Sequence, residues 1–189
     1  HADNTWTRQA VPSVDLTGNV SVVVTAGGQL WAGGSVGDAA ATVAIDESTR
    51  TLTTHPDFRH GVFQIATFGS DVWVGAHPDT RVSGRPGGAL RFDGTRWHHL
   101  HGAGAPGSPY GFAQLPNGDI ITTGNAVRVY DGTTWSLLEA PAELQTPYTH
   151  TAVVDRSGAL WIASRAYGVF RLLDGVWTRF TAQDGLPGQ

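Results

Sequence analysis

The chain has 189 residues, 40% of them hydrophobic and 15% charged, so it is long enough to bury a core and too apolar for a disordered protein. Its net charge is −4 and its cations are arginines without a basic run, so we expect no nucleic-acid partner. The sequence has no cysteine, which excludes disulfides, zinc fingers and thiol catalysis. No apolar run approaches the roughly 20 residues that cross a bilayer, so we also expect no membrane insertion.

The chain begins with a short segment that matches a segment near its end. Asn4-Thr5-Trp6-Thr7-Arg8 resembles residues 175–179, which predicts an isolated outer strand whose own meander is missing. Four meanders of four short strands then follow, with turns rich in glycine and proline. They are expected over residues 19–54, 61–101, 110–139 and 151–181.

The last meander is the clearest of the four. Its apolar and aromatic runs suit strands, and Asp174-Gly175 favours a type I′ hairpin turn because both residues tolerate positive φ. Tryptophan or isoleucine recurs on the second strand of each meander at Trp31, Trp73, Ile121 and Trp161. These spacings are typical of a β-propeller. We therefore predict an all-β protein, a β-propeller of four complete four-stranded blades plus one extra N-terminal outer strand, forming a single domain over residues 1–189.

The last meander also resembles a known family. GALWIAS, YGVFRLLDGVW and the closing DGLPG are similar to the two-component-regulator propeller repeats of the extracellular sensor regions of bacterial hybrid histidine kinases. The resemblance implies a propeller fold, a sensing or binding role, and an extracellular or periplasmic location. It implies no catalytic residues.

Four blades and one isolated strand do not make a closed ring of that family. A ring that lacks inner strands exposes unpaired edges, which proteins normally avoid. We therefore expect either self-association or a missing continuation of the propeller.

The candidate binding residues lie where the loops of one propeller face meet the central channel. Alignment on the second-strand positions brings inner-strand residues to one rim, and the long loop from Ala76 to Gly88 should overhang the same rim. Arginine forks and aromatic rings there could hold a small acidic or hydroxylated molecule or a glycan, although the aromatics could also merely pack. The predicted ligand-binding residues are His60, His77, Arg81, Arg85, Tyr110, Tyr148 and His150.

Metal and cofactor chemistry find little support in the sequence. His99 and His101 would share one face of a strand, but zinc sites generally need three or four ligands, so we expect no metal there. No nucleophile elbow, phosphate-binding glycine loop or recurrent carboxylate pair is present, so we expect no cofactor and assign no catalytic residue.

Three functions remain open from the sequence. The first is a non-enzymatic ligand-binding, sensor or interaction propeller. The second is a carbohydrate-binding lectin, which requires solvent-facing tryptophans, whereas their periodic placement favours the core. The third is a propeller lyase or hydrolase that uses His60, His77 or His150 as a base.

Overall fold

The computed structural model of the chain describes residues 16–26, 29–45, 50–78, 88–147 and 149–187, and the side chains of residues 17–26, 50 and 60 lie outside this description. The described part confirms the all-β prediction: it consists of strands and two short 3-10 helices. None of its helices is long and apolar enough to cross a membrane. The isolated strand predicted at residues 4–8 lies outside the described residues.

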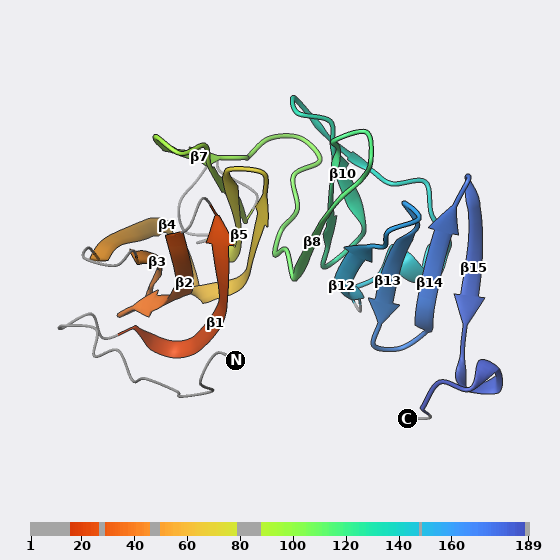
Figure 1. The fold of residues 1–189 in the computed structure, drawn as a ribbon. Coiled ribbons are helices and arrows are strands. Elements are labelled where there is room, and N and C mark those ends of the chain that lie inside the picture. Colours follow the sequence, from red (N-terminus) through yellow and green to blue (C-terminus); the bar gives the residue numbers. More distant parts are fainter. Residues whose placement is uncertain (1–15, 27–28, 46–49, 79–87, 148, 188–189) are drawn as a thin grey trace, which may run out of the picture.

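Three antiparallel sheets account for all of these strands (Figure 1). The first has seven strands in chain order, β1 (Thr17–Ala26), β2 (Gln29–Val36), β3 (Ala39–Ile45), β4 (Arg50–Phe68), β5 (Asp71–Pro78), β6 (Ala89–Phe92) and β7 (Trp97–His99). The second contains β8 (Gly111–Gln114), β9 (Ile120–Thr123), β10 (Arg128–Tyr130) and β11 (Trp135–Leu137). The third contains β12 (Thr149–Val154), β13 (Leu160–Ser164), β14 (Gly168–Leu173) and β15 (Val176–Phe180). The 3-10 helices are η1 (Ala142–Leu144) and η2 (Ala182–Asp184).

We divide these strands into four units. Unit one is β1, β2, β3 and the first half of β4, through Arg59; unit two is the second half of β4 with β5, β6 and β7. Unit three is β8–β11, and unit four is β12–β15. The first strands of units three and four, β8 and β12, lie beside each other (Figure 1).

The predicted separation between the first two meanders, at residues 55–60, is wrong. β4 runs without a break, pairing with β3 through Arg59 and with β5 from Phe58 onward. The extra residues of the link are absorbed as a bulge, since Ala39 pairs with Arg59 while Ala40 pairs with His55. Phe58 and His55 are buried, and their burial holds the link in the sheet.

The Asp-Gly pairs form two kinds of turn. Asp174 and Gly175 have φ values of 51° and 76°, as the predicted type I′ turn requires. Asp93 instead begins a longer loop between β6 and β7, and its carboxylate accepts hydrogen bonds from the backbone N–H groups of Thr95 and Arg96. Hydrogen bonds from Thr95 lower the pKa of Asp93 well below its usual range. The predicted turn at Asp174-Gly175 is therefore confirmed.

Large side chains on the second strand of each unit pack against the unit that follows. The ring of Trp31 lies 5.3 Å from that of Phe92 and 5.8 Å from that of Trp97, both in unit two. Trp73 likewise packs on Phe112 of unit three, at 6.0 Å. Burial of such a side chain is worth about 1.5–3 kcal/mol, so these contacts stabilise the packing of neighbouring units, and β4 joins units one and two in addition.

In unit three, isoleucine replaces tryptophan at this position. Ile121 is fully buried and belongs to one apolar cluster with Leu160, Ile162 and Phe170 of unit four. The same packing plan therefore joins each of the first three units to the next.

Candidate functional site

The candidate site lies at the rim where the first strand of each unit begins and the second strand ends. Antiparallel pairing places these points together: Arg59 is opposite His77, and Thr149 is opposite Ser164. Tyr110 sits just before β8, with its backbone N–H bonded to the carbonyl of Thr123 at the end of β9. The rim thus gathers residues from units two, three and four.

Three aromatic side chains follow one another along this rim, one from each unit. Tyr110 stacks on His150, with ring centroids 5.5 Å apart and an interplanar angle of 13°. Phe63 also packs on Tyr110, with ring centroids 5.2 Å apart and an interplanar angle of 48°. His150 is exposed, whereas Phe63 and Tyr110 are half-buried. We call this row the aromatic line.

Two of the three rings stand on β-bulges. Phe63 falls between the pairs that Val62 and Gln64 make with β5, where the register shifts. His150 falls in the same kind of shift on β12, between Thr149 and Thr151. A bulge redirects a side chain out of the normal alternation of a strand. The rings therefore leave the packing between units and meet at the rim.

Glycines let the units approach closely enough for the rings to meet. A Cβ atom at Gly111 would lie 3.0 Å from the carbonyl oxygen of His150, and one at Gly75 would lie 2.4 Å from the carbonyl oxygen of Pro109. The second distance is shorter than any real Cβ contact, so only glycine fits at position 75 without a shift of the backbone.

His77 has a polar partner at the same rim. Its Nδ1 atom lies 2.7 Å from the hydroxyl oxygen of Ser108, a buried residue two positions before Tyr110. This hydrogen bond fixes the half-buried imidazole against unit three. The His77 imidazole and the Ser108 hydroxyl are therefore polar groups of the same rim as the aromatic line.

The structure places only some of the predicted site residues. Tyr110 and His150 come together as expected, and His77 lies at the same rim. The backbone of His60 belongs to β4, but its side chain is not described. Arg81, Arg85 and Tyr148 lie outside the described residues and stay predictions.

Sequence reasoning missed Phe63 and Ser108. The prediction assumed regular strands, whereas the bulge between Val62 and Gln64 brings Phe63 to the rim. Gly61, with a φ of 87°, was the available signal that the strand is irregular there.

The histidines of the second unit do not gather into a metal site. The rings of His99 and His101 are 5.2 Å apart and edge-on, while Nε2 of His98 lies 2.6 Å from a carboxylate oxygen of Asp93. Within the described ranges, no group of three or more side chains of the ligating types His, Cys, Asp and Glu gathers in one place.

The tryptophans bear on the lectin hypothesis. Every tryptophan in the described part of the chain is buried or half-buried. A sugar platform needs an exposed indole face, so the described tryptophans do not support a repeated sugar site. All of them except Trp161, whose ring contacts lie within its own unit, belong to the apolar clusters of the structure.

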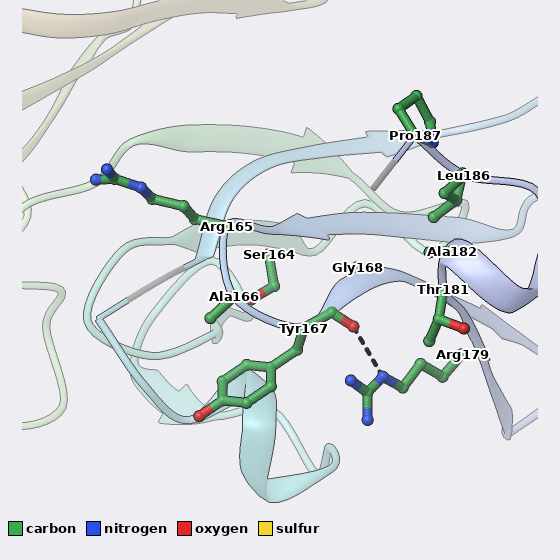
Figure 2. A pocket seen from close by; sticks show the side chains of 10 residues that line it. All are labelled: Ser164, Arg165, Ala166, Tyr167, Gly168, Arg179, Thr181, Ala182, Leu186 and Pro187. Atoms are coloured by element: carbon green, nitrogen blue, oxygen red, sulfur yellow. Dashed lines mark hydrogen bonds between the residues drawn. The ribbon is translucent and has the colours of Figure 1, made fainter. Parts of the chain in front are cut away.

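Apart from the aromatic line, a pocket lies at the rim of unit four (Figure 2). Its volume is about 330 Å³, and the turn from Arg165 to Tyr167 forms one wall. The Nε–H of Arg179 donates to the carbonyl oxygen of Tyr167 at 2.8 Å, and one of its terminal nitrogens lies 3.4 Å from a carboxylate oxygen of Glu143. The guanidinium of Arg179 is thus already engaged by groups of the chain itself.

These features define the class of protein. Repeated antiparallel meanders, joined by large apolar side chains on their second strands, with first strands side by side, belong to the β-propeller class of all-β folds.

No protein-family model and no curated protein matches the chain, whereas several solved structures do. Virginiamycin B lyase from Staphylococcus aureus is 16% identical, with a TM-score of 0.58 over 84% of this chain and 54% of its own. PorZ, an essential bacterial surface component of the type-IX secretion system of Porphyromonas gingivalis, is 16% identical, with a TM-score of 0.57 over 79% of this chain and 24% of its own. The extracellular domain of BT4673 from B. thetaiotaomicron, assigned to a one-component system, is 15% identical with a TM-score of 0.44 over 91% of this chain and 29% of its own.

The chain therefore spans about half the length of the lyase and about a quarter of that of PorZ. At these identities the similarity shows the fold alone. It supports the propeller class predicted from the last meander, and no family model supports the finer resemblance to sensor repeats.

Proposed function

We propose that the chain is a non-enzymatic binding module of the propeller type, and that its ligand lies against the aromatic line. The observation that carries this proposal is the stacking of Tyr110 on the exposed ring of His150, with Phe63 behind it. Bulges disturb strand pairing, and they recur at two of the three positions. Rings that served only the core would not need them.

The chemistry of the line favours a flat or ring-shaped ligand. Aromatic faces stack on aromatic groups and on the apolar faces of sugars, and His150 adds a hydrogen-bonding edge. The His77–Ser108 pair is a fixed polar group of the same rim. A small ligand that carries a ring and an acidic or hydroxyl group fits this combination.

A panel of ring-bearing ligands tests the proposal. Ligand-observed NMR would screen small aromatic acids, monosaccharides and aromatic short peptides against the wild-type chain, and against a variant carrying Tyr110→Ala and His150→Ala. We expect saturable binding of at least one class to the wild type and its loss in the variant. His101→Ala is the matched control, because His101 is exposed and lies outside the line. Binding that survives in the double variant would place the site elsewhere.

The two other functions predict different results in the same experiments. A lectin would bind monosaccharides and keep binding when the aromatic line is removed, because its sites would be tryptophans. A lyase or hydrolase with a histidine base would turn a ligand over, and His77→Ala or His150→Ala would abolish the turnover without abolishing binding.

We further propose a sensor or interaction role outside the cytoplasm. The similarity of the last meander to extracellular sensor repeats supports it, and PorZ, which shares the fold, is a bacterial surface component. Protease added to intact cells that make the native protein would digest a surface-exposed chain, and would reach a periplasmic one only after the outer membrane is opened. Protection in both cases would contradict this location.

A further inference from the structure

The pocket at the rim of unit four contains a polar group that no part of the described chain satisfies. Ser164, at the end of β13, lines this pocket and is 8% exposed. Its hydroxyl oxygen is buried and has no hydrogen-bond partner among the described residues. A buried hydroxyl without a partner lowers stability, so such a group in a native protein needs an explanation. A ligand in the pocket would offer the missing partner.

The corresponding position is small and apolar in every other unit. Counted from the large side chain of the second strand, Ser164 corresponds to Gly34, Ala76 and Gly124. A Cβ atom at Gly124 would lie 2.4 Å from the carbonyl oxygen of Ser108, so the segment before β8 occupies this space in unit three. The packing plan that the units share therefore does not explain a hydroxyl group at this place.

The same pocket is lined by a guanidinium that the protein holds in a fixed position. The Nε–H of Arg179, near the end of β15, donates to the carbonyl oxygen of Tyr167 at 2.8 Å (Figure 2). Its guanidinium carbon lies 5.8 Å from the ring centre of Tyr167 and 5.6 Å from that of Phe170. The corresponding residues of units two and three are His99 and Leu137, which carry no such group. A guanidinium that is already fixed loses little rotamer freedom when it binds a ligand.

The contacts of Arg179 leave some of its donors available. A guanidinium has more N–H groups than the bond to Tyr167 and the contact with Glu143 use. The contact with Glu143 is long, at 3.4 Å, and the two side chains are 41% and 37% exposed, so this ion pair contributes little free energy. Asp184, the acid on η2, is engaged by the backbone N–H and the hydroxyl of Thr181. An incoming carboxylate would therefore displace Glu143 from Arg179 at little cost.

We propose that this pocket binds a small organic acid, whose carboxylate is held by Arg179 and accepts a hydrogen bond from Ser164. Guanidinium and carboxylate groups form strong, often bidentate hydrogen bonds. The volume of about 330 Å³ is at the lower end for small-molecule sites, and Leu186 and Pro187 line the pocket beside the polar groups. An acid with a short apolar or ring-shaped remainder fits this space.

Two neighbouring features are separate from this site. Arg165 also lines the pocket, but its side chain is directed away from Arg179 (Figure 2), so the carboxylate is assigned to Arg179. No lining residue of the pocket belongs to the aromatic line, so the inference does not rest on the function proposed above.

An NMR titration that resolves the backbone amide signals of the full chain tests the site. Butyrate and benzoate are the ligands, and the uncharged butyramide and benzamide are their matched controls. We expect the acids to bind with a dissociation constant on the order of 1 mM, because one charged contact and a few apolar atoms hold them. The signals of Ser164, Gly168 and Leu186 should shift with the acids and not with the amides. Shifts confined to Tyr110 and His150 would place the acids on the aromatic line and overturn the assignment of this pocket.

Charge variants test the role of Arg179. Arg179→Gln should raise the dissociation constant about tenfold or more, because it removes the cation. Glu143→Gln should lower it several-fold, because it removes the competing carboxylate. Arg156→Gln, the same change as Arg179→Gln at an exposed arginine outside the pocket, should leave it unchanged. If Arg179→Gln fails to fold, Glu143→Gln decides, since its side chain is partly exposed.

Ser164→Ala separates the binding role of this hydroxyl from a structural one. The variant should bind the acids several-fold more weakly, while the melting temperature of the free protein should not fall, because the hydroxyl has no partner to lose. Acids that leave every signal of the pocket unshifted overturn the proposal, as do amides that bind as tightly as the acids or a Glu143→Gln chain that binds no tighter than the wild type.

Discussion

His55 should make the protein sensitive to mild acid. Its ring is buried in the first sheet, 4.7 Å from the ring of Trp97, and its Nε2 atom lies 3.0 Å from the hydroxyl oxygen of Thr42. Burial lowers the pKa of His55 from 6.5 to about 4, because a charged imidazole would lose its hydration there. The folded protein therefore holds this ring neutral at a pH where the unfolded chain protonates it.

The sign and size of the effect follow from that difference. Between pH 6.5 and about 4 the unfolded state binds more protons than the folded state, so the free energy of unfolding falls as the pH falls. Above pH 6.5 both states are neutral and the contribution is constant. The full loss across this window is about 3 kcal/mol, a large part of the stability of a typical domain.

Urea unfolding followed by tryptophan fluorescence at a series of pH values measures this loss. His55→Gln keeps a neutral polar side chain at the site and should remove most of the loss between pH 6.5 and 4. His101→Gln, at an exposed position, should leave it unchanged. If the His55→Gln protein loses as much stability as the wild type over that range, the burial argument is refuted.

Three other substitutions test the packing and the turns by urea denaturation and thermal melting. Gly75→Ala should cost about 1–3 kcal/mol, because its Cβ would lie 2.4 Å from the carbonyl oxygen of Pro109; a neutral effect would mean that the units are less tightly apposed. Ile121→Ala should cost about 2–5 kcal/mol by leaving a cavity under unit four, and Leu137→Ala, at an exposed site, should cost almost nothing. Asp155→Ala should lower the melting temperature, because its carboxylate accepts four hydrogen bonds in one turn; an unchanged temperature would show that the turn forms without them.

The repeat plan could be predicted from the sequence because it rests on local signals. Strand-forming runs, Asp-Gly turns and regularly spaced tryptophans are each determined by a few residues that are near one another in the sequence. The turn at Asp174-Gly175, for example, has the positive φ values that its residues favour. The alignment of the repeats also predicted that Tyr110 and His150 lie close together, because equivalent residues of neighbouring repeats lie at the same rim.

Other features depend on contacts between distant segments and could not be predicted in the same way. The first meander was expected to end at residue 54 and the second to begin at residue 61, but burial of His55 and Phe58 keeps the segment between them extended within β4. The bulge at Phe63 depends on how β4 pairs with β5; Gly61 marks the strand as irregular there but does not specify the register.

The uninterrupted β4 determines where the molecule could be lengthened or divided. Units one and two share β4, and Arg59 pairs with both β3 and β5, so a cut or an insertion at that residue would break pairing on both sides at once. The largely exposed turn at residues 101–103 lies outside the strands, so chain could be added or exchanged there at little cost. If proteins of this kind arose by duplication of repeats, the first two units would have been duplicated together, whereas units three and four could each have been duplicated separately.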